Sequence, residues 1–316
     1  MSRYLVTGGA GFIGSHIVRE LAARGEVLCV LDNFSTGRRE NLAAMKDQVT
    51  VYDLDICELE KIRPAFAGVE YVIHLAAMPS VARSVADPLA TNAVNLDGTL
   101  HVLLAARDAA VRRVIFAASA AAYGDNPTLP RRESQMPNPL SPYALAKLAG
   151  EYYCQIFSRI YRLQTVALRF FNIFGPGQNP DSPYTGVLSK FISAYVRKTT
   201  PVIFGGGEQS RDFTYVANVV QAVLLACNAA EAPGKVINIG TGESYTLNQT
   251  ITLLNEIFGQ QVRVRYDPPR PGDALHSRAD ISLARQVLGY EPKVQFEQGL
   301  RETVKWYQSV HGKGGD

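Results

Sequence analysis

A glycine pattern, G-x-x-G-x-x-G over Gly8–Gly14, constrains the fold of this chain more than any other feature. The apolar run Tyr4–Thr7 precedes it and predicts a strand buried on both faces of a parallel sheet. After it, apolar residues recur at helical spacing as far as Gly25, where a left-handed cap is expected to end the helix. The run Val27–Leu31 predicts a second buried strand.

These glycines and one acidic residue have the chemistry of a dinucleotide site. Gly8 and Gly11 let the backbone approach a pyrophosphate without a Cβ in the way, and Gly14 lets the helix pack close to the strand. The helix N-terminus then offers free N–H groups and a positive dipole end to the phosphates. Asp32, 18 residues after Gly14, is placed to accept hydrogen bonds from the adenosine ribose and would repel a 2′-phosphate. The sequence therefore predicts NAD rather than NADP.

Strand and helix patterns keep alternating along the chain. This alternation predicts an α/β fold, a doubly wound parallel sheet of the Rossmann type. The expected strands are Val49–Tyr52, Tyr71–Leu75, Val114–Ala117 and Thr165–Arg169, and the expected helices are Asn92–Ala109 and Tyr143–Tyr161. Ligands bind such sheets beyond the carboxyl ends of the strands. We therefore expect cofactor contacts from Gly8, Gly11, Phe12, Ile13, Gly14, Asp32, Asn33, Ser35, Thr36, Gly37, Asp55, Ile56, Leu75, Ala76, Ala77, Tyr143 and Lys147.

The character of the chain changes at Gly175, where loops become frequent and helices shorter. We expect an NAD-binding domain over 1–174 and a smaller mixed α/β lobe that binds the substrate over 175–316. Within this lobe, about 212–241 is expected to return to the main sheet, with Val236–Ile239 as a strand.

Tyr143 and Lys147 stand four residues apart at the start of a predicted helix, a spacing that puts both on one face. A phenol is a poor base at neutral pH, because its ordinary pKa is about 10. A nearby ammonium and the positive charge of an oxidised nicotinamide would lower that pKa. Tyr143 could then take a hydroxyl proton while hydride leaves the same carbon for the cofactor.

Composition narrows the class of protein. A net charge of +3 over 316 residues resembles no nucleic-acid footprint, so no nucleic-acid partner is expected. The four cysteines are scattered and the histidines have no metal spacing, so no metal site is expected, and His74 is interpreted as a packing residue. The chain has neither a leader pattern nor a long apolar run, which favours a cytoplasmic protein without a membrane span.

Several motifs together resemble those of the extended short-chain dehydrogenase/reductases, and among them the UDP-hexose 4-epimerase group. The shared motifs are Gly8–Gly14, His74–Ala77, Ser119-x-x-x-Tyr123-Gly124, Tyr143-x-x-x-Lys147, Arg169–Asn172, Ser210–Phe213 and Arg270–Asp273. The resemblance implies that Ser119 is catalytic beside Tyr143 and Lys147. It also implies that hydride moves from sugar C4 to NAD and back to the opposite face, through a 4-keto intermediate. A homodimer built on helices near 92–109 and 143–161 is a further implication.

The residues after Ser119 distinguish relatives within this group. Related 4,6-dehydratases and decarboxylases place acidic residues there, whereas this chain has Ala120, Ala121 and Ala122, which cannot transfer a proton. Epimerases themselves usually carry more hydroxylated residues at these positions. Either the positions are packed small, which we favour, or the chain is a variant that has lost hydroxyls and turns over slowly.

The resemblance also places Ser277 at the family's gatekeeper position, where a small residue leaves room for a 2-acetamido group. Arg83 and Ser84 could reach the sugar, and Arg83 could pair with a uronate carboxylate. Hence UDP-N-acetylglucosamine (UDP-GlcNAc) and UDP-GalNAc are the leading substrates, UDP-Glc and UDP-Gal are possible, and UDP-glucuronic acid is the alternative. The expected substrate contacts are Arg83, Ser84, Ser119, Asn172, Arg211, Arg270, Asp273 and Ser277, with Arg211 and Arg270 as pyrophosphate clamps.

Two other classes of function stay open at this point. A non-catalytic NAD-binding protein on the same fold would be expected to lose Tyr143, Lys147 or Ser119, and all three are present. Another nucleotide-sugar oxidoreductase, with net oxidation or reduction, is compatible with the same residues.

Overall fold

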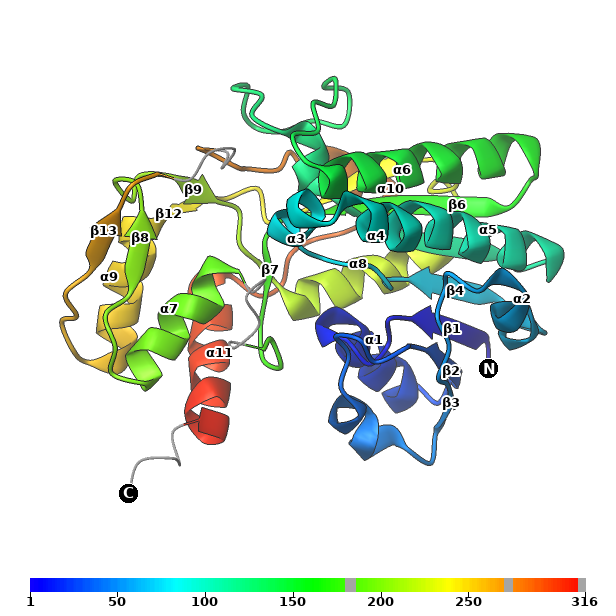
Figure 1. Ribbon diagram of the computed structural model, residues 1–316, viewed down its shortest axis with the longest axis horizontal. Coiled ribbons are helices and arrows are strands. Elements are labelled where there is room, and N and C mark those ends of the chain that lie inside the picture. The colour runs from blue at the N-terminus through cyan, green and yellow to red at the C-terminus, as the bar shows by residue number, and fades with distance from the viewer. Residues whose placement is uncertain (180–185, 270–274, 312–316) are drawn as a thin grey trace.

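Seven apolar strands form one parallel sheet in the order β11-β6-β5-β4-β1-β2-β3 (Figure 1). The computed structural model describes residues 1–179, 186–269 and 275–311. The strands are β1 (Arg3–Thr7), β2 (Val27–Leu31), β3 (Val49–Tyr52), β4 (Tyr71–His74), β5 (Arg113–Ser119), β6 (Gln164–Phe170) and β11 (Val236–Ile239). The predicted α/β fold with a doubly wound parallel sheet is confirmed.

Helices cover both faces of this sheet because successive strand residues point to opposite sides. Val6 and Val30 belong to the core under α1 (Phe12–Ala23), α8 (Val216–Asn228) and α10 (Ser282–Leu288). Leu5 and Leu31 belong to a second core under α2 (Leu59–Ile62), α5 (Gly98–Asp108) and α6 (Pro142–Ile160). The central strands are largely apolar because helices cover both faces of the sheet there, whereas the edge strand β3 leaves Thr50 and Val51 exposed.

One predicted helix boundary is wrong. The helix expected from Asn92 begins earlier, as α4 (Pro88–Asn92), and continues through a π-helical turn over Ala93–Asp97 into α5. The Asp87 carboxylate accepts a hydrogen bond from the Ala90 N–H at 3.0 Å, and Pro88 occupies the first turn. An N-cap aspartate followed by proline is the ordinary start of a helix.

A smaller lobe lies beside the sheet (Figure 1). Its helices are α7 (Val187–Val196), α9 (Leu247–Phe258) and α11 (Phe296–His311), and an aromatic cluster of Phe174, Phe213 and Phe296 lies in its core. Three two-stranded sheets complete it: β7 (Ile173–Phe174) with β10 (Thr214–Tyr215), β8 (Val202–Phe204) with β13 (Arg265–Asp267), and β9 (Ser210–Arg211) with β12 (Tyr245–Thr246).

Segments from the second half of the chain also build the main sheet. Strand β11 pairs in parallel with β6, in the register Val236 to Ala167, and α8 packs against α1. Helix α10 packs against β11 and α8 in the same core. The division of the chain at residue 174 stays a prediction.

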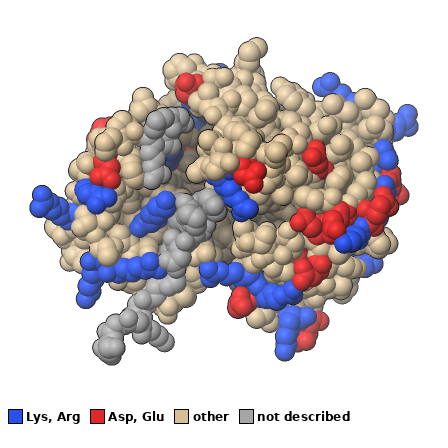
Figure 2. Space-filling view, in the orientation of Figure 1, with Lys and Arg blue, Asp and Glu red and all other residues tan. Residues whose placement is uncertain are grey.

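Charges on the face shown in Figure 2 are interleaved rather than gathered by sign. Arg63, for example, is ion-paired with both Glu60 and Asp108. Within the described ranges, no helix combines the length and the apolar character that a bilayer crossing requires.

Candidate active site

A single cavity of about 1210 Å³ runs beyond the carboxyl ends of the central strands. Its lining comes from the glycine turn after β1, the segments after β2 to β6, the start of α6 and the smaller lobe. All the predicted cofactor residues line it: Gly8, Gly11, Phe12, Ile13, Gly14, Asp32, Asn33, Ser35, Thr36, Gly37, Asp55, Ile56, Leu75, Ala76, Ala77, Tyr143 and Lys147.

The glycine turn has the shape of a phosphate cradle. Gly8 has φ +70°, and a Cβ there would lie 2.7 Å from the backbone nitrogen of Ala76. A Cβ on Gly14 would overlap the carbonyl oxygen of Gly8, so this glycine allows α1 to pack against the turn. Gly11 is the N-cap of α1 and caps no N–H with a side chain, which leaves the first helical N–H groups available to an anion. The residues present fit the pyrophosphate of a dinucleotide.

Asp32 is held rigidly beside this cradle. Its two carboxylate oxygens accept hydrogen bonds from the N–H groups of Ala10, at 2.9 Å, and Phe34, at 2.8 Å. Burial raises the pKa of Asp32, and these two N–H donors oppose that rise. The carboxylate keeps lone pairs for ribose hydroxyls, and its negative charge disfavours a 2′-phosphate.

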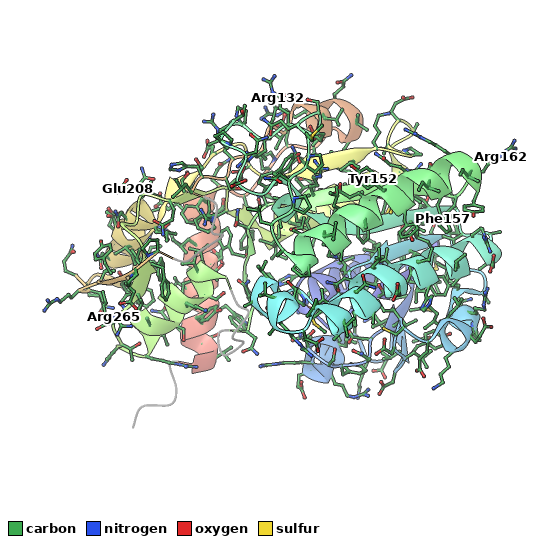
Figure 3. All side chains as sticks on the ribbon, turned by 45° about the horizontal axis from the view of Figure 1, so that its top comes forward. Arg132, Tyr152, Phe157, Arg162, Glu208 and Arg265 are labelled. Carbon is green, nitrogen blue, oxygen red and sulfur yellow. The ribbon has the colours of Figure 1, made fainter. Side chains whose placement is uncertain are left out.

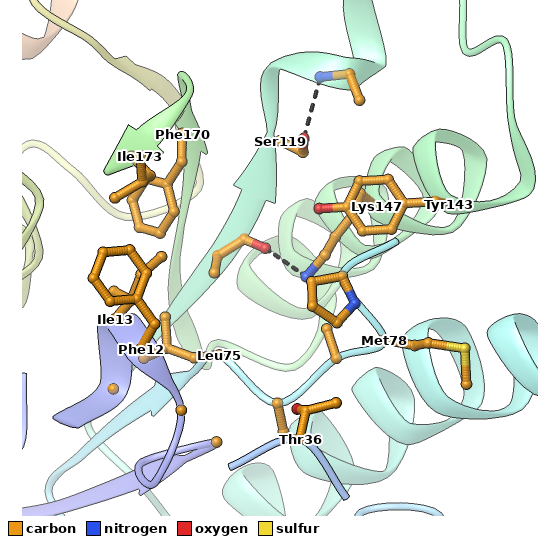
Figure 4. A pocket seen from close by; sticks show the side chains of 18 of the residues that line it. Phe12, Ile13, Thr36, Leu75, Met78, Ser119, Tyr143, Lys147, Phe170 and Ile173 are labelled. Atoms are coloured by element: carbon orange, nitrogen blue, oxygen red, sulfur yellow. Dashed lines mark hydrogen bonds between the residues drawn. The ribbon is translucent and has the colours of Figure 1, made fainter. Parts of the chain in front are cut away.

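Ser119, Tyr143 and Lys147 lie together at the middle of the cavity (Figure 4). Ser119 ends β5, where its Oγ accepts a hydrogen bond from the N–H of Ala121 at 3.2 Å. The other two residues come from the first turns of α6, which begins where Ser141 caps the N–H of Ala144. Lys147 is 5% exposed and donates from Nζ to the carbonyl oxygen of Ala117 at 2.8 Å.

Burial shifts the pKa values of Tyr143 and Lys147. The sequence led us to expect a lowered pKa for Tyr143, and the shift is in the opposite direction. Burial lowers the pKa of Lys147 to about 8 and raises the pKa of Tyr143, which the Ser119 hydroxyl lowers only in part. Burial therefore keeps the phenol protonated. When an oxidised nicotinamide is bound, its positive charge would lower the pKa of Tyr143.

His74 is a packing residue, as the sequence predicted. Its two ring nitrogens are hydrogen-bonded to the hydroxyls of Thr7, at 2.7 Å, and Thr99, at 3.1 Å. Burial, followed by the nearby charge of Lys147, lowers the pKa of His74 to about 3, so the ring is neutral.

The alanines after Ser119 are of two kinds. Ala122 is fully buried, which fits a position packed small, whereas Ala120 and Ala121 line the cavity. The three residues form a 3-10 turn that ends at Tyr123. This stretch of the wall carries no proton donor, so elimination of water or carbon dioxide has no acid or base here.

The predicted substrate residues fall into three groups. Ser119 and four others line the cavity, namely Arg83, Asn172, Arg211 and Ser277. Ser84 does not reach it, because its side chain is fully buried within α3 (Val81–Ala86) and donates to the carbonyl of Val81 at 2.7 Å. Arg270 and Asp273 lie outside the described residues.

A smaller cavity of about 260 Å³ adjoins the first in the second lobe. The two share Asn172, Ile173, Gln178 and Arg211, and the smaller one is lined further by Phe204 and Phe213. Aromatic rings beside amide side chains suit a flat ring with polar edges, such as a nucleobase.

Comparison with known proteins assigns the family. The family model described as "NAD dependent epimerase/dehydratase family" matches residues 4–240. The chain belongs to this family. A putative UDP-glucose 4-epimerase of Methanocaldococcus jannaschii is 37% identical over 306 residues, which cover 96% of this chain and 98% of that one.

Solved structures of other epimerases agree with this family. The UDP-glucose 4-epimerase of Thermotoga maritima, solved with UDP-glucose, is 40% identical with a TM-score of 0.93, over 98% of this chain and 99% of that one. The UDP-N-acetylglucosamine 4-epimerase of Methanobrevibacter ruminantium, in complex with UDP-N-acetylmuramic acid, is 42% identical with a TM-score of 0.92, over 98% of both chains. As a member of the UDP-sugar 4-epimerase group, the chain is an isomerase whose cofactor is NAD.

Several residues that line or support this site were not predicted from the sequence. Arg131, Gln178 and His276 line the cavity, and Asn95 fixes the Met78 segment by hydrogen bonds to its backbone N–H and carbonyl. None of these residues stands in a pattern of spacing, so only the folded chain reveals them. Asn95 lies in the π-helical turn, a feature frequent at functional sites.

Proposed function

We propose that the protein interconverts UDP-GlcNAc and UDP-GalNAc by inversion at C4, and that it also accepts UDP-Glc and UDP-Gal. The observation that carries this proposal is the single cavity, since it joins the dinucleotide cradle, Tyr143, Lys147 and Ser119 with the small residue Ser277. A substrate that reaches all of these groups has its reacting carbon beside both a proton acceptor and the cofactor site.

The positions of the three residues support the catalytic roles that we propose for them. Ser119 hydrogen-bonds the 4-oxygen of the sugar and relays its proton to Tyr143. Lys147, held on the carbonyl of Ala117, keeps a positive charge in a buried place close to the phenol. Bound NAD supplies the acceptor that takes hydride from C4 and returns it to the opposite face. Because the cofactor is regenerated in each cycle, it can stay bound.

The proposed sugar specificity rests on small residues around the catalytic end. Ser277 is a small residue at this wall, and Pro79, Ala120 and Ala121 are also compact lining residues. Together they leave space for an acetamido group on C2. A sugar without the acetamido group still fits this pocket but leaves part of it unfilled. We therefore expect UDP-Glc and UDP-Gal to be slower substrates.

The nucleotide end is proposed to use the second lobe. The smaller cavity holds the uracil, and Arg211, which lines both cavities, binds the diphosphate with its planar set of donors. Asn172 lies at the junction, where its amide also donates to the carbonyl of Asp212 at 3.1 Å.

A panel assay tests this function directly. Purified protein is incubated with UDP-GlcNAc, UDP-Glc or UDP-glucuronic acid, and inversion at C4 is followed by NMR while cofactor reduction is followed by absorbance. Inversion of UDP-GlcNAc without net reduction is the expected result. Net accumulation of reduced cofactor, or no inversion of any member of the panel, would refute the proposal.

We also propose that the protein is a homodimer joined through α6. Leu145, Tyr152, Ile156 and Ile160 are exposed apolar residues spaced along one face of this helix, and Tyr152 is labelled on it in Figure 3. Leu89 of the neighbouring α4 extends the same apolar surface. A contiguous apolar patch of this kind is typical of an interface.

A cytoplasmic location is part of the same proposal. All four cysteines, Cys29, Cys57, Cys154 and Cys227, are free thiols, and three of them are buried. Unpaired cysteines in a chain of this size are typical of a reducing compartment. Fractionation of the native cells, with an antibody to the protein, would test the location.

A further inference from the structure

Arg131 is a buried cation that lines the active-site cavity. It is 4% exposed, and its Nη1 donates to the carbonyl of Thr128 at 3.3 Å. Among the residues that the structure describes, no carboxylate lies within ion-pair distance of its guanidinium; Asp125 acts on it only at longer range. Burial lowers the pKa of Arg131, and the nearby Tyr123 and Asp125 offset this only in part, which reflects the cost of holding a charge in this place.

The backbone of Arg131 places this cation at the catalytic end of the cavity. Its N–H donates to the carbonyl of Arg278 at 2.7 Å, and its carbonyl accepts from the N–H of Asp280 at 2.8 Å. It thereby runs beside the segment that carries Ser277. Gly124 lies close by in sequence and lines the same cavity, directly after the 3-10 turn that Ser119 caps.

The charges along the cavity are distributed unevenly. The described acidic lining residues, Asp32 and Asp55, follow β2 and β3 at the end assigned to the adenosine. The substrate half is lined by Arg83, Arg131 and Arg211 with no described carboxylate among its lining residues. A UDP diphosphate carries two negative charges, and Arg211 at the mouth of the smaller cavity is positioned to meet it. A neutral sugar would leave the charge of Arg131 uncompensated.

We propose that Arg131 binds a carboxylate carried by the sugar of the nucleotide-sugar substrate. A carboxylate is the group that a guanidinium recognises best, since two parallel N–H donors meet two oxygens. Such a group belongs either to a uronic acid, at C6, or to a lactyl ether on the ring, as in N-acetylmuramic acid. This inference rests on the proposed function and adds a carboxylate-bearing sugar to the neutral sugars proposed there.

Calorimetric titration with matched ligand pairs tests the proposal without turnover. UDP-glucuronic acid is compared with UDP-Glc, and UDP-N-acetylmuramic acid with UDP-GlcNAc, so that each pair differs by a carboxylate-bearing group. Arg131→Met removes the charge at similar volume. Arg132→Met is the control, because Arg132 is the adjacent arginine, is exposed, is ion-paired with Asp280 and points away from the molecule (Figure 3).

The expected result is a loss of roughly 10- to 100-fold in affinity for one of the charged ligands in Arg131→Met. Its neutral counterpart should change less than about threefold, and Arg132→Met should bind both like the wild type. Whichever pair responds identifies the position of the carboxylate. An equal loss for charged and neutral ligands would overturn the proposal, because Arg131 would then bind the diphosphate or serve the fold.

Wild-type binding provides a check that does not depend on how the variant folds. The wild type should prefer the charged member of at least one pair by about tenfold or more, and added salt should weaken this preference. No preference in either pair overturns the inference. Charged-ligand preference without inversion at C4 would instead refute the proposed function and leave the Arg131 site standing.

Discussion

At the scale of single residues, burial favours the protonated form of the Tyr143 phenol. Tyr143 is affected first by burial, which raises its pKa, and the neighbouring Ser119 hydroxyl compensates only in part. Lys147 loses part of its affinity for protons to the same burial. In the proposed mechanism, proton transfer to Tyr143 therefore depends on the oxidised cofactor, whose positive charge would lower the pKa of the phenol.

The first prediction concerns Tyr143→Phe. Removal of the phenolic hydroxyl removes the proton acceptor, so kcat should fall about 10³-fold. NAD should remain bound, since the glycine cradle and Asp32 are untouched. Absorbance of the cofactor released on denaturation measures the content, and NMR measures the rate. Retained activity would show that another group is the base.

Lys147 sets the expected pH dependence. Its pKa of about 8 means that the ammonium form is lost as the pH rises through that value. The wild-type kcat should therefore decline above about pH 8, in contrast to an ordinary lysine with a pKa near 10.4. Lys147→Met should be slower by about 10² and should lack this alkaline decline. The same decline in the variant would exclude Lys147 as its origin.

Ser277 offers a steric test of specificity. A tyrosine at this position would occupy the space proposed for the acetamido group, so Ser277→Tyr should lower kcat/KM for UDP-GlcNAc by about tenfold or more. Turnover of UDP-Glc should be retained. Competition between the two substrates in one tube measures the ratio, and an unchanged ratio would remove Ser277 as the gatekeeper.

At the scale of elements, the irregular segments position the wall of the site. The π-helical turn between α4 and α5 directs Asn95 inward, where its amide makes hydrogen bonds of 2.7 Å and 3.1 Å to the backbone of Met78. Met78 and Pro79 line the cavity, and Arg83 follows on α3. The π-helical turn thus holds in place the segment around Met78 and Pro79, which lines the proposed substrate site.

The variant Asn95→Ala tests whether Asn95 positions the Met78 segment for substrate binding in addition to stabilising the fold. Loss of two buried hydrogen bonds should lower the free energy of unfolding by about 1–3 kcal/mol. The substitution should also raise KM for the nucleotide sugar more than it lowers kcat. The reason is that the Met78 segment, once loosened, contacts the substrate but takes no part in the chemical step. Asn92→Ala, on the exposed side of the same helical stretch, is the control. Equal kinetics in the two variants would contradict a positioning role.

The sequence specified those elements whose causes are local. The glycine turn, the acidic residue ending β2 and the Tyr143–Lys147 spacing each follow from a few neighbouring residues. The start of α4 was missed although Asp87 and Pro88 marked it, because the helical periodicity was followed only from Asn92. Arg131 and Asn95 depend on which distant segments fold against them, and the burial of Ser84 depends on the packing of α3. No local pattern encodes these contacts.

At the scale of the whole molecule, the face of α6 opposite the catalytic residues is the surface through which two copies would meet. Ile156→Glu places a charge in its centre, and the proposed dimer should then dissociate to monomers. Tyr266→Glu is the control, since Tyr266 is an exposed apolar residue on β13 of the other lobe. Light scattering after size exclusion measures the mass. A monomeric wild type, or a dimeric Ile156→Glu variant, would contradict this interface.

The return of late segments to the main sheet has a consequence for synthesis. Strand β11 and helix α10 complete the core around β6 and α8, yet they are translated after the whole glycine cradle has left the ribosome. During synthesis the β6 edge of the sheet therefore stays unpaired, and the core incomplete, until the chain has been translated to about residue 290. We expect nascent chains that end before β11 to depend on chaperones and to bind no cofactor, even though they already contain every residue predicted to contact it.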